Sequence, residues 1–452
     1  MGRVKSVLKR IPFIKGLNNS IKTSWKNDVK KLLESNSEMT KKNEKLIRNL
    51  IREQEELKKS MEQLEKSNRE YEAKILEMRT CMEEDVHKVY DRVRTAEINS
   101  VKAVDNAWKN YYAEQRRRDD WKVRAEEVSR QAGDKKIWVI KCPAPDSELK
   151  SAWGDYPFAK SLAKNLERLG AYVVIDLYQD WSCQVAADYV IVLRGTRSYH
   201  PDRTNKKCVY IMWNISHPED ITLDEYNLYD IVCVGSSYYA KQLKGQLTIP
   251  VYTLEQCTDT ELFYPAEKEP KKLHDYIFVG NSRGVRRESV LWSVDMRLPI
   301  EIWGTGWTSF LGSGCTNVVA DKIENNLLPD LYRSSLATIN DHWQDMLKYQ
   351  FINNRIFDAV ACGLPVITDY CEDLYKIFGD SLLYYRNEEE FRQCILKIEN
   401  NYDEIRANTL AMWDIIKEKY SFEARAKQIV DIIKEYKSNT SQQAMGHAPA
   451  SL

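Results

Sequence analysis

A strand that ends in a glycine turn and then runs into arginines is the first stretch of this chain that could bind phosphate. The stretch FVGNSRGVRR carries an apolar strand into Gly280 and Asn281 and then into a basic helix start. Backbone N–H groups at such a turn, together with Arg283, Arg286 or Arg287, suit a diphosphate. We count Gly280, Asn281 and Arg286 as candidate contacts. The alternative is an ordinary strand-to-helix turn with solvated arginines.

A second glycine turn, WGTGW, has the same character. It follows a predicted strand at residues 300–303, and its Gly304 would let a ligand approach the backbone closely. Taken alone, a core tryptophan that lies beside a turn is an equally good interpretation of this stretch.

The most specific stretch is INDHWQDMLKYQFINNRIFDAVACGLPVIT, which contains Asn340, Asp341, Asn354, Arg355 and Asp358. Arg355 and Asp358 are three residues apart on a predicted helix and therefore share one face. A guanidinium on that face could hold a phosphate, and a carboxylate could hold a pair of ribose hydroxyls. The alternative is a plain surface ion pair, which is common on helices.

The first half of the chain offers further polar residues beside predicted strand and helix ends. Gly154 and Asp155 precede a helix that opens at Pro157, and His217 follows a predicted strand. A histidine near a cleft could act as a base near pH 7 or donate a hydrogen bond, and Arg194 could bind an anionic group. Asp155 is also simply a good residue for a helix start, and His217 could be purely structural.

Composition and missing motifs narrow the chemistry. The chain has 67 basic and 67 acidic residues, a balance that argues against bulk electrostatic binding of nucleic acid. Its 10 cysteines form no CxxC pair, which leaves a zinc site with little support and fits a reducing cytoplasm. No DxD motif occurs. We therefore expect no metal, and we expect arginines, backbone amides and a helix N-terminus to neutralise a diphosphate.

Alternating strands and helices after Gly133 would position these residues. Apolar strands are expected at residues 136–142, 172–177, 189–193, 208–213 and 231–234, and again at 276–279, 300–303, 336–339, 365–368 and 382–384. Such alternation indicates parallel sheets covered on both faces. The predicted fold class is α/β with two doubly wound Rossmann-like domains, whose ligands bind at the carboxyl ends of the strands.

A heptad seam precedes the sheets. Apolar residues recur at alternating spacings of three and four from Ile47 to Met82, with polar Gln54 and Asn68 on the same seam. This period is typical of a coiled coil, in which polar seam residues can fix the register. We expect a homo-oligomer through residues 45–112, because a solitary helix cannot hide such a stripe. A single long helix packed on the rest of the chain is the alternative.

The extreme N-terminus mixes basic and apolar residues. A segment such as RVKSVLKRIPFIKGLNNSIK can lie at an anionic membrane surface, although Pro12 interrupts a continuous helix, and a solvated tail is the alternative. No signal peptide is evident, and no run of about 18 apolar residues predicts a membrane span. The expected boundaries are a basic amphipathic segment at 1–22, a coiled coil at 23–132, Rossmann-like domains at 133–260 and 261–437, and a disordered tail at 438–452.

Several of these strings resemble a known family. DAVACGLPVIT resembles the (L/F)-(E/D)-A-x-A-C-G-x-P-V-I element of retaining glycosyltransferases with the GT-B architecture. The fuller string from NDHW to ACG is similar to the CgeB-like, spore-maturation-protein-like branch of group 1 glycosyltransferases, as are YIMWNISHP, YDIVCVGS and CTDTELFYP. The resemblance covers about residues 136–435. That branch includes enzymes of bacterial surface polysaccharides, among them rhamnosyltransferases.

The resemblance carries over residue by residue. It places Asp358 at the second acid of an E-x7-E motif, which contacts the donor ribose, while Gln350 stands where the family has the first acid. Donor-sugar recognition must therefore differ here. Arg355 matches an NR pair suited to the diphosphate, and Gly280 with Asn281 matches the donor-domain glycine loop.

The resemblance implies a glycosyltransferase of the hexosyltransferase class, and the missing DxD motif predicts that it is metal-independent. It would use a nucleoside-diphosphate sugar as co-substrate, no other cofactor, and a growing lipid-linked glycan or glycolipid as acceptor. Asp155 and His217 are the catalytic candidates, with Gly154 and Arg194 on the acceptor side. We expect a cytoplasmic homo-oligomer, peripheral on the inner face of the membrane. The alternatives are a nucleotide-sugar epimerase, or a coiled-coil scaffold with a degenerate transferase body.

Overall fold

The computed structural model describes residues 19–65, 123–147, 150, 153–178, 181, 186–268, 270–312 and 315–446. These fall into two compact units, residues 1–117 and 118–452. Nothing in the described helices is long and apolar enough to cross a membrane.

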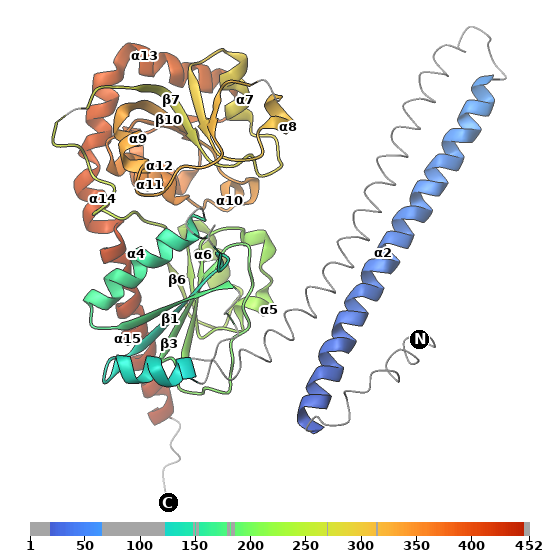
Figure 1. Cartoon of the computed structure of the whole chain (residues 1–452), viewed down its shortest axis with the longest axis vertical. Helices are drawn as coiled ribbons and strands as arrows, with labels where there is room; N and C mark the ends of the chain where they lie inside the picture. Colours follow the sequence, from blue (N-terminus) through green and yellow to red (C-terminus); the bar gives the residue numbers. More distant parts are fainter. Residues whose placement is uncertain are drawn as a thin grey trace, which may run out of the picture. The chain divides into compact units, whose positions relative to one another are not determined.

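The described part of the first unit is one helix, α2, from Asn19 to Glu65 (Figure 1). The predicted helix is confirmed over these residues, and Leu32, Met39 and Leu46, spaced seven residues apart, are exposed on it. The rest of the predicted seam, and the basic segment up to residue 18, lie outside the described residues. The coiled coil therefore stays a prediction.

Removal of the N-terminal segment should abolish self-association. In light scattering, the full-length chain should be a homo-oligomer, most simply a dimer, because an apolar stripe needs a second copy to leave water. A chain that starts at residue 118, where the second unit begins, should be a monomer. A monomeric full-length chain, or a truncated chain with an unchanged oligomeric state, would contradict this prediction.

The second unit begins with a helix at residues 123–132, whose Val128 and Ala132 are buried in the core, and continues with a six-stranded parallel sheet. Its strands are β1 (Ile137–Cys142), β2 (Tyr172–Leu177), β3 (Tyr189–Arg194), β4 (Val209–Asn214), β5 (Ile231–Val234) and β6 (Val251–Thr253). They lie in the order β2-β1-β3-β4-β5-β6, and α4 (Asp155–Arg168), α5 (Leu223–Tyr226) and α6 (Ser237–Lys244) connect them. Strands β1, β3, β4 and β5 are buried along their whole length, as continuous apolar runs require of a sheet covered on both faces.

A second six-stranded parallel sheet follows. Its strands are β7 (His274–Val279), β8 (Ile300–Trp303), β9 (Val318–Ala320), β10 (Ser335–Asn340), β11 (Val366–Asp369) and β12 (Leu383–Tyr385), in the order β12-β11-β10-β7-β8-β9. The helices are α7 (Glu288–Asp295), α8 (Thr308–Leu311), α9 (Leu328–Ser334), α10 (Gln344–Lys348), α11 (Asn354–Ala361) and α12 (Glu372–Phe378). Both sheets confirm the predicted α/β class. Every predicted strand is present, and the edge strands β6 and β9 are additions.

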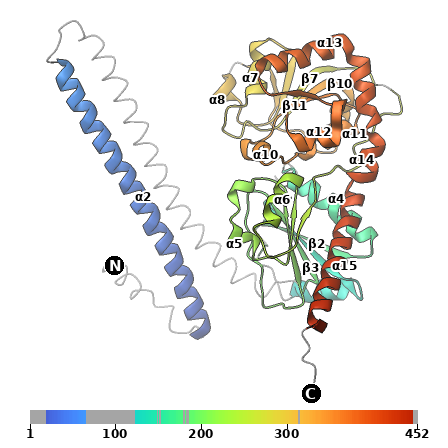
Figure 2. The same ribbon diagram turned by 180° about the vertical axis from the view of Figure 1, so that it is seen from behind.

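The C-terminal helices connect the two halves a second time. Helices α13 (Glu388–Ala411), α14 (Trp413–Lys419) and α15 (Phe422–Gly446) follow one another from the second half to the first (Figures 1 and 2). The side chains of Phe422, Ile429 and Ile433 join the hydrophobic core of the first sheet beside α4. The sequence grouped this helix with the second half, but its apolar face completes the core of the first. The expected disorder of residues 438–446 is wrong, because α15 continues to Gly446.

The chain crosses between the two halves twice, once between β6 and β7 at residues 254–273 and once between α14 and α15. These two crossings are hydrogen-bonded to each other. Thr258 N donates to Tyr420 O at 3.0 Å, and Phe422 N donates to Thr258 O at 3.2 Å. These bonds form an isolated parallel bridge between Thr258 and Ser421. The Arg425 guanidinium adds a further bond between the two crossings, because its Nε donates to Glu255 O at 2.7 Å.

Candidate active site

The two glycine turns meet at the carboxyl ends of β7 and β8. Gly280 N donates to Trp303 O at 2.8 Å, and Asn281 Oδ1 accepts from Thr305 N at 2.9 Å. Gly304 has φ of +156°, and a Cβ added to it would lie 2.2 Å from Gly280 O. Only glycine fits there, because a side chain would collide with the Gly280 backbone, and the two turns therefore pack directly against each other.

Three arginines gather around Gly280. Arg287 is 4% exposed, and Arg355 Nη1 lies 3.5 Å from where a Cβ on Gly280 would sit. The Arg283 guanidinium stacks 4.5 Å from the centre of the Trp343 ring. Burial lowers the pKa of all three arginines, and Arg355 lowers the pKa of the other two further. This is a concentration of positive charge, buried at Arg287 and partly buried at Arg283 and Arg355, which favours the entry of an anion.

Only one of these three arginines is paired. Arg287 forms a buried ion pair with Asp341 through two nitrogens. Among the described residues no ion pair is found for Arg283 or Arg355. The guanidinium groups of Arg283 and Arg355, which are partly exposed, are therefore available to a ligand.

Arg286, the candidate donor contact, points elsewhere. Its side chain is 67% exposed, and its Nε pairs with Glu288 Oε1 at 2.7 Å. Its neighbours Arg283 and Arg287 lie at the glycine turn instead. Arg283 is turned inward by its left-handed backbone, with φ of +65°, and Arg287 by its pairing with Asp341.

Helix α11 presents Arg355 but buries Asp358. The Asp358 side chain accepts from Thr258 Oγ1 at 2.5 Å and from Asn354 Nδ2 at 3.1 Å. With 4% of Asp358 exposed, the alternative of a surface ion pair with Arg355 is wrong. A ribose hydroxyl at Asp358 would have to share these oxygens.

Replacement of Asp358 by Asn should stabilise the fold more at pH 8 than at pH 5. Burial raises the pKa of Asp358 to about 7, above the ordinary aspartate value of about 3.9. Below pH ~4 both folded and unfolded chains hold the proton. As pH rises to about 7 only the unfolded chain ionises, so stability is lost through this window and stays lost above it.

An asparagine can keep both contacts, since its oxygen can accept from Asn354 and its nitrogen can donate to the Thr258 hydroxyl. Melting temperatures of wild type and variant at the two pH values test this. An equal change at both values, or a larger gain at pH 5, would count against a carboxyl that is protonated in the fold.

His217 reaches the second half of the chain. Its ring centroid lies 5.1 Å from that of Trp343, and its Nδ1 lies 3.8 Å from Asp345 Oδ2. Because Arg283 stacks on the same Trp343 ring, a first-half histidine and a second-half arginine both contact one side chain. Burial lowers the pKa of His217, offset in part by Asp345.

Asp155 is the first residue of α4 and is half-buried. Burial raises its pKa to about 6, and Asp155 in turn raises the pKa of Cys142 at the end of β1. The ends of β1 and β4, which lead to Asp155 and His217, are separated by β3 alone, or about 10 Å at two strand spacings. Gly154 is exposed, with no atom within 4 Å of an added Cβ.

Arg194 is not available to bind an anion. It is 3% exposed, and its Nε and Nη2 donate to the Glu225 carboxylate at 2.6 and 3.0 Å. Another bond runs from Nη2 to Asp220 O at 2.9 Å. The expected acceptor-side contact is wrong, because this arginine instead holds the loop that follows His217.

The remaining candidate residues are hydrogen-bonded to other protein groups around the site. Asn340 Nδ2 donates to Thr368 Oγ1 at 3.0 Å, and Asp341 is occupied by Arg287. Gln350 has φ of +60°, and its Oε1 accepts from Asp373 N at 2.9 Å. Asp373 in turn accepts from Ser237 Oγ at 2.8 Å. Gln350 therefore supports an α12-to-α6 contact between the halves.

The site also contains residues that the sequence did not single out. Trp343 and Asp345 contact His217, and Gln256 contacts the first residue of α11. Trp343 and Asp345 lie inside the NDHW-x-DM string, so that motif could have identified them as site residues. Nothing local distinguishes Gln256.

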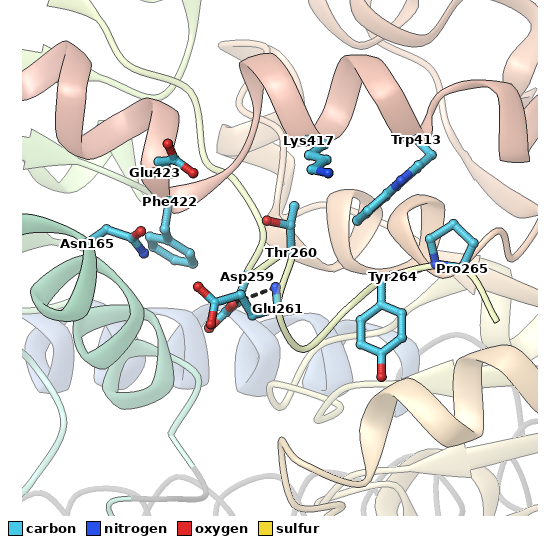
Figure 3. Close-up of a pocket in the computed structure, with 10 residues that line it drawn as sticks. All are labelled: Asn165, Asp259, Thr260, Glu261, Tyr264, Pro265, Trp413, Lys417, Phe422 and Glu423. Atoms are coloured by element: carbon cyan, nitrogen blue, oxygen red, sulfur yellow. Dashed lines mark hydrogen bonds between the residues drawn. The ribbon is translucent and has the colours of Figure 1, made fainter. Parts of the chain in front are cut away.

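A cavity of about 600 Å³ lies beside the crossings rather than at this site. Its lining residues come from α4, the linker, α14 and the start of α15 (Figure 3): Asn165, Asp259, Thr260, Glu261, Tyr264, Pro265, Trp413, Lys417, Phe422 and Glu423. Its acids are already engaged, for example Asp259 with Ser161 and Glu423 with Lys427. We assign it no ligand.

Comparison with known proteins agrees with this geometry. Residues 286–431 match a family model described as glycosyl transferase-like. A sucrose-phosphate synthase from Thermosynechococcus elongatus superposes with a TM-score of 0.53 at 11% identity, covering 68% of this chain and 100% of that one. An α,α-trehalose 6-phosphate synthase from Burkholderia multivorans gives 0.50 at 8% identity, covering 68% and 100%. No curated protein sequence matches the chain. At these identities the structural likeness shows the fold, which is GT-B.

Proposed function

We propose that this chain is a glycosyltransferase that takes its sugar from a nucleoside-diphosphate sugar. The observation that carries the proposal is the partly buried arginine cluster at the glycine turns, in which Arg283 and Arg355 have no ion pair among the described residues. A diphosphate supplies the two negative charges that such a cluster needs. The glycosyl transferase-like match over residues 286–431 supports the same chemistry.

In this proposal the donor binds the second half. The diphosphate lies against Gly280, Asn281 and Arg355, and Gly304 lets the adjacent turn pack against Gly280. Arg283 replaces Arg286 as the second arginine at the diphosphate. Asp358 remains the candidate ribose contact, shared with Thr258 and Asn354.

The first half supplies the catalytic base. His217 lies next to Arg283 through Trp343, and its lowered pKa leaves the ring neutral at pH 7, as a base requires. Asp155 is the second candidate, since its carboxyl titrates closer to neutral pH than an exposed aspartate.

A screen of nucleotide sugars tests the proposal. Thermal shift with UDP-, GDP- and dTDP-sugars should identify one stabilising donor, because a ligand that binds only the folded chain raises its melting temperature. Mass spectrometry then separates the outcomes. A transferase releases the nucleoside diphosphate and glycosylates an acceptor, whereas an epimerase returns an altered nucleotide sugar. If no nucleotide sugar raises the melting temperature, the chain behaves as a scaffold and the proposal is contradicted.

Transfer should be independent of metal ions. The arginine cluster supplies the positive charge that a bridging cation would otherwise provide, and no DxD motif is present. Turnover in EDTA should match turnover without it. Complete loss in EDTA, restored by Mn²⁺, would refute this prediction.

The finer assignments extend the proposal. The CgeB-like strings favour a bacterial surface glycan as acceptor, a hexosyltransferase reaction and rhamnose among the possible sugars. A lipid-linked acceptor would place the enzyme in the cytoplasm at the inner face of the membrane. Binding of the full-length chain to vesicles with anionic lipid tests the membrane contact.

A further inference from the structure

One buried amide joins the two sides of the candidate site. Gln256 lies between β6 and the Thr258 bridge and is 6% exposed. Its Nε2 donates to Ile215 O at 2.6 Å, and its Oε1 accepts from Asn354 N at 2.9 Å. Ile215 stands two residues before His217, and Asn354 stands directly before Arg355.

We propose that Gln256 is a positioning residue that sets where His217 lies relative to the donor-binding arginines. The inference rests on the proposed function. A primary amide suits this place, because it offers a donor at one end and an acceptor at the other. Its two partners are main-chain groups on opposite sides of the site, so the side chain acts as a spacer between them.

The neighbouring contacts make this spacer effective. Thr258, two residues on, donates to Asp358 at 2.5 Å, so the same crossing holds α11 at its first amide and one helical turn further along. On the other side, Ile215 N donates to Arg194 O at 3.0 Å, which ties the chain before His217 to β3. A displacement of α11 is therefore passed through Gln256 to the His217 loop.

Kinetics provide the first test. Gln256→Leu should lower kcat at least tenfold, while the affinity for UDP, GDP or dTDP, whichever binds the wild type, stays within about threefold. The arginines all belong to the second half, which explains the expected split. Gln256→Glu should also lower kcat, since an ionised carboxylate still accepts from Asn354 N but cannot donate to Ile215 O.

Gln428→Leu is the matched control. Gln428 is another glutamine at the crossings, and its Nε2 donates to Thr253 O at 3.0 Å. Within the part of the chain that the structure describes, Gln428 makes no contact with His217, Arg355 or their immediate neighbours, so its loss should leave kcat within about threefold. An equal loss of kcat in both variants would show a general effect on the fold and overturn the proposal.

Titration of the histidine rings by nitrogen NMR provides a test that needs no activity. The chain has 6 histidines, and the His217 signal is the one that His217→Ala removes. His217 faces Asp345, Asp220, Arg283 and Arg194, and burial holds its pKa below the ordinary value. Gln256→Leu should move that pKa upward, because a released loop is better hydrated, whereas Gln428→Leu should not.

An unchanged His217 titration in Gln256→Leu overturns the proposal whatever the kinetics show. A kcat within threefold of wild type, or equal losses in kcat and nucleotide affinity, also overturns it. If the wild type transfers no sugar, the proposed function fails, and the titration still decides whether Gln256 positions His217.

Discussion

Arg355→Ala should weaken the binding of a nucleoside diphosphate by about 100-fold, or about 2.7 kcal/mol. Arg355 lies beside Gly280 and has no ion pair among the described residues, so its charge is free for the ligand. Loss of a buried charged hydrogen bond to an anion costs about this much. The fold should survive, because the substitution leaves no buried carboxylate unpaired.

Calorimetry with UDP, GDP and dTDP measures this effect, and Arg286→Ala is the matched control. Arg286 belongs to the same stretch but is exposed and paired with Glu288, so its removal should change affinity less than threefold. Arg287→Ala is a poor test, because it would leave the Asp341 carboxylate without its ion-pair partner and could destabilise the fold. Unchanged affinity in Arg355→Ala would rule out the arginine cluster as the diphosphate site.

His217→Ala should lower kcat by about 100-fold or more, the usual cost of removing a general base. Burial lowers the pKa of His217, so the ring is neutral and able to accept a proton at pH 7. The acid limb of kcat/KM in the wild type should therefore lie below the ordinary histidine value of about 6.5. Steady-state kinetics across pH 5 to 8 measure both effects.

Two further variants are measured in the same way: Asp155→Asn tests the other candidate base, and His274→Ala is the control. Asp155 is the other candidate for the chemical step, and a large effect there instead would transfer the role to it. His274 opens β7, at the opposite end of that strand from Gly280, and pairs with Glu301, so its removal should leave turnover nearly unchanged. If both Asp155→Asn and His217→Ala stay within about threefold of wild type, neither residue acts as the base.

The strands could be predicted because each carries its own signal. Apolar runs such as residues 231–234 are buried in a parallel sheet, and the turn glycines that follow β7 and β8 are equally local. The edge strands β6 and β9 are three residues long and too short to establish a period. The place of α15 depends on a complementary apolar surface on α4, which local periodicity does not reveal.

Side-chain roles were harder to predict, because they depend on distant partners. Arg286 and Arg287 are adjacent, but Arg287 is held inward by Asp341, 54 residues away, and by a bond to Asn281 O at 2.7 Å. Arg194 follows a strand end as a ligand contact would, but Glu225, 31 residues away, occupies it. Asp358 was placed correctly on its helix, yet its contact with Thr258 comes from 100 residues earlier.

The return of α15 to the first sheet has a consequence for the order of synthesis on the ribosome. Residues up to 257 complete the strands of that sheet, but Phe422, Ile429 and Ile433 of its core emerge much later. At about 5–20 residues per second, the wait is roughly ten to thirty seconds. During this interval the α4 surface that receives α15 is uncovered, so the nascent first half should depend on chaperones until the last helix is made.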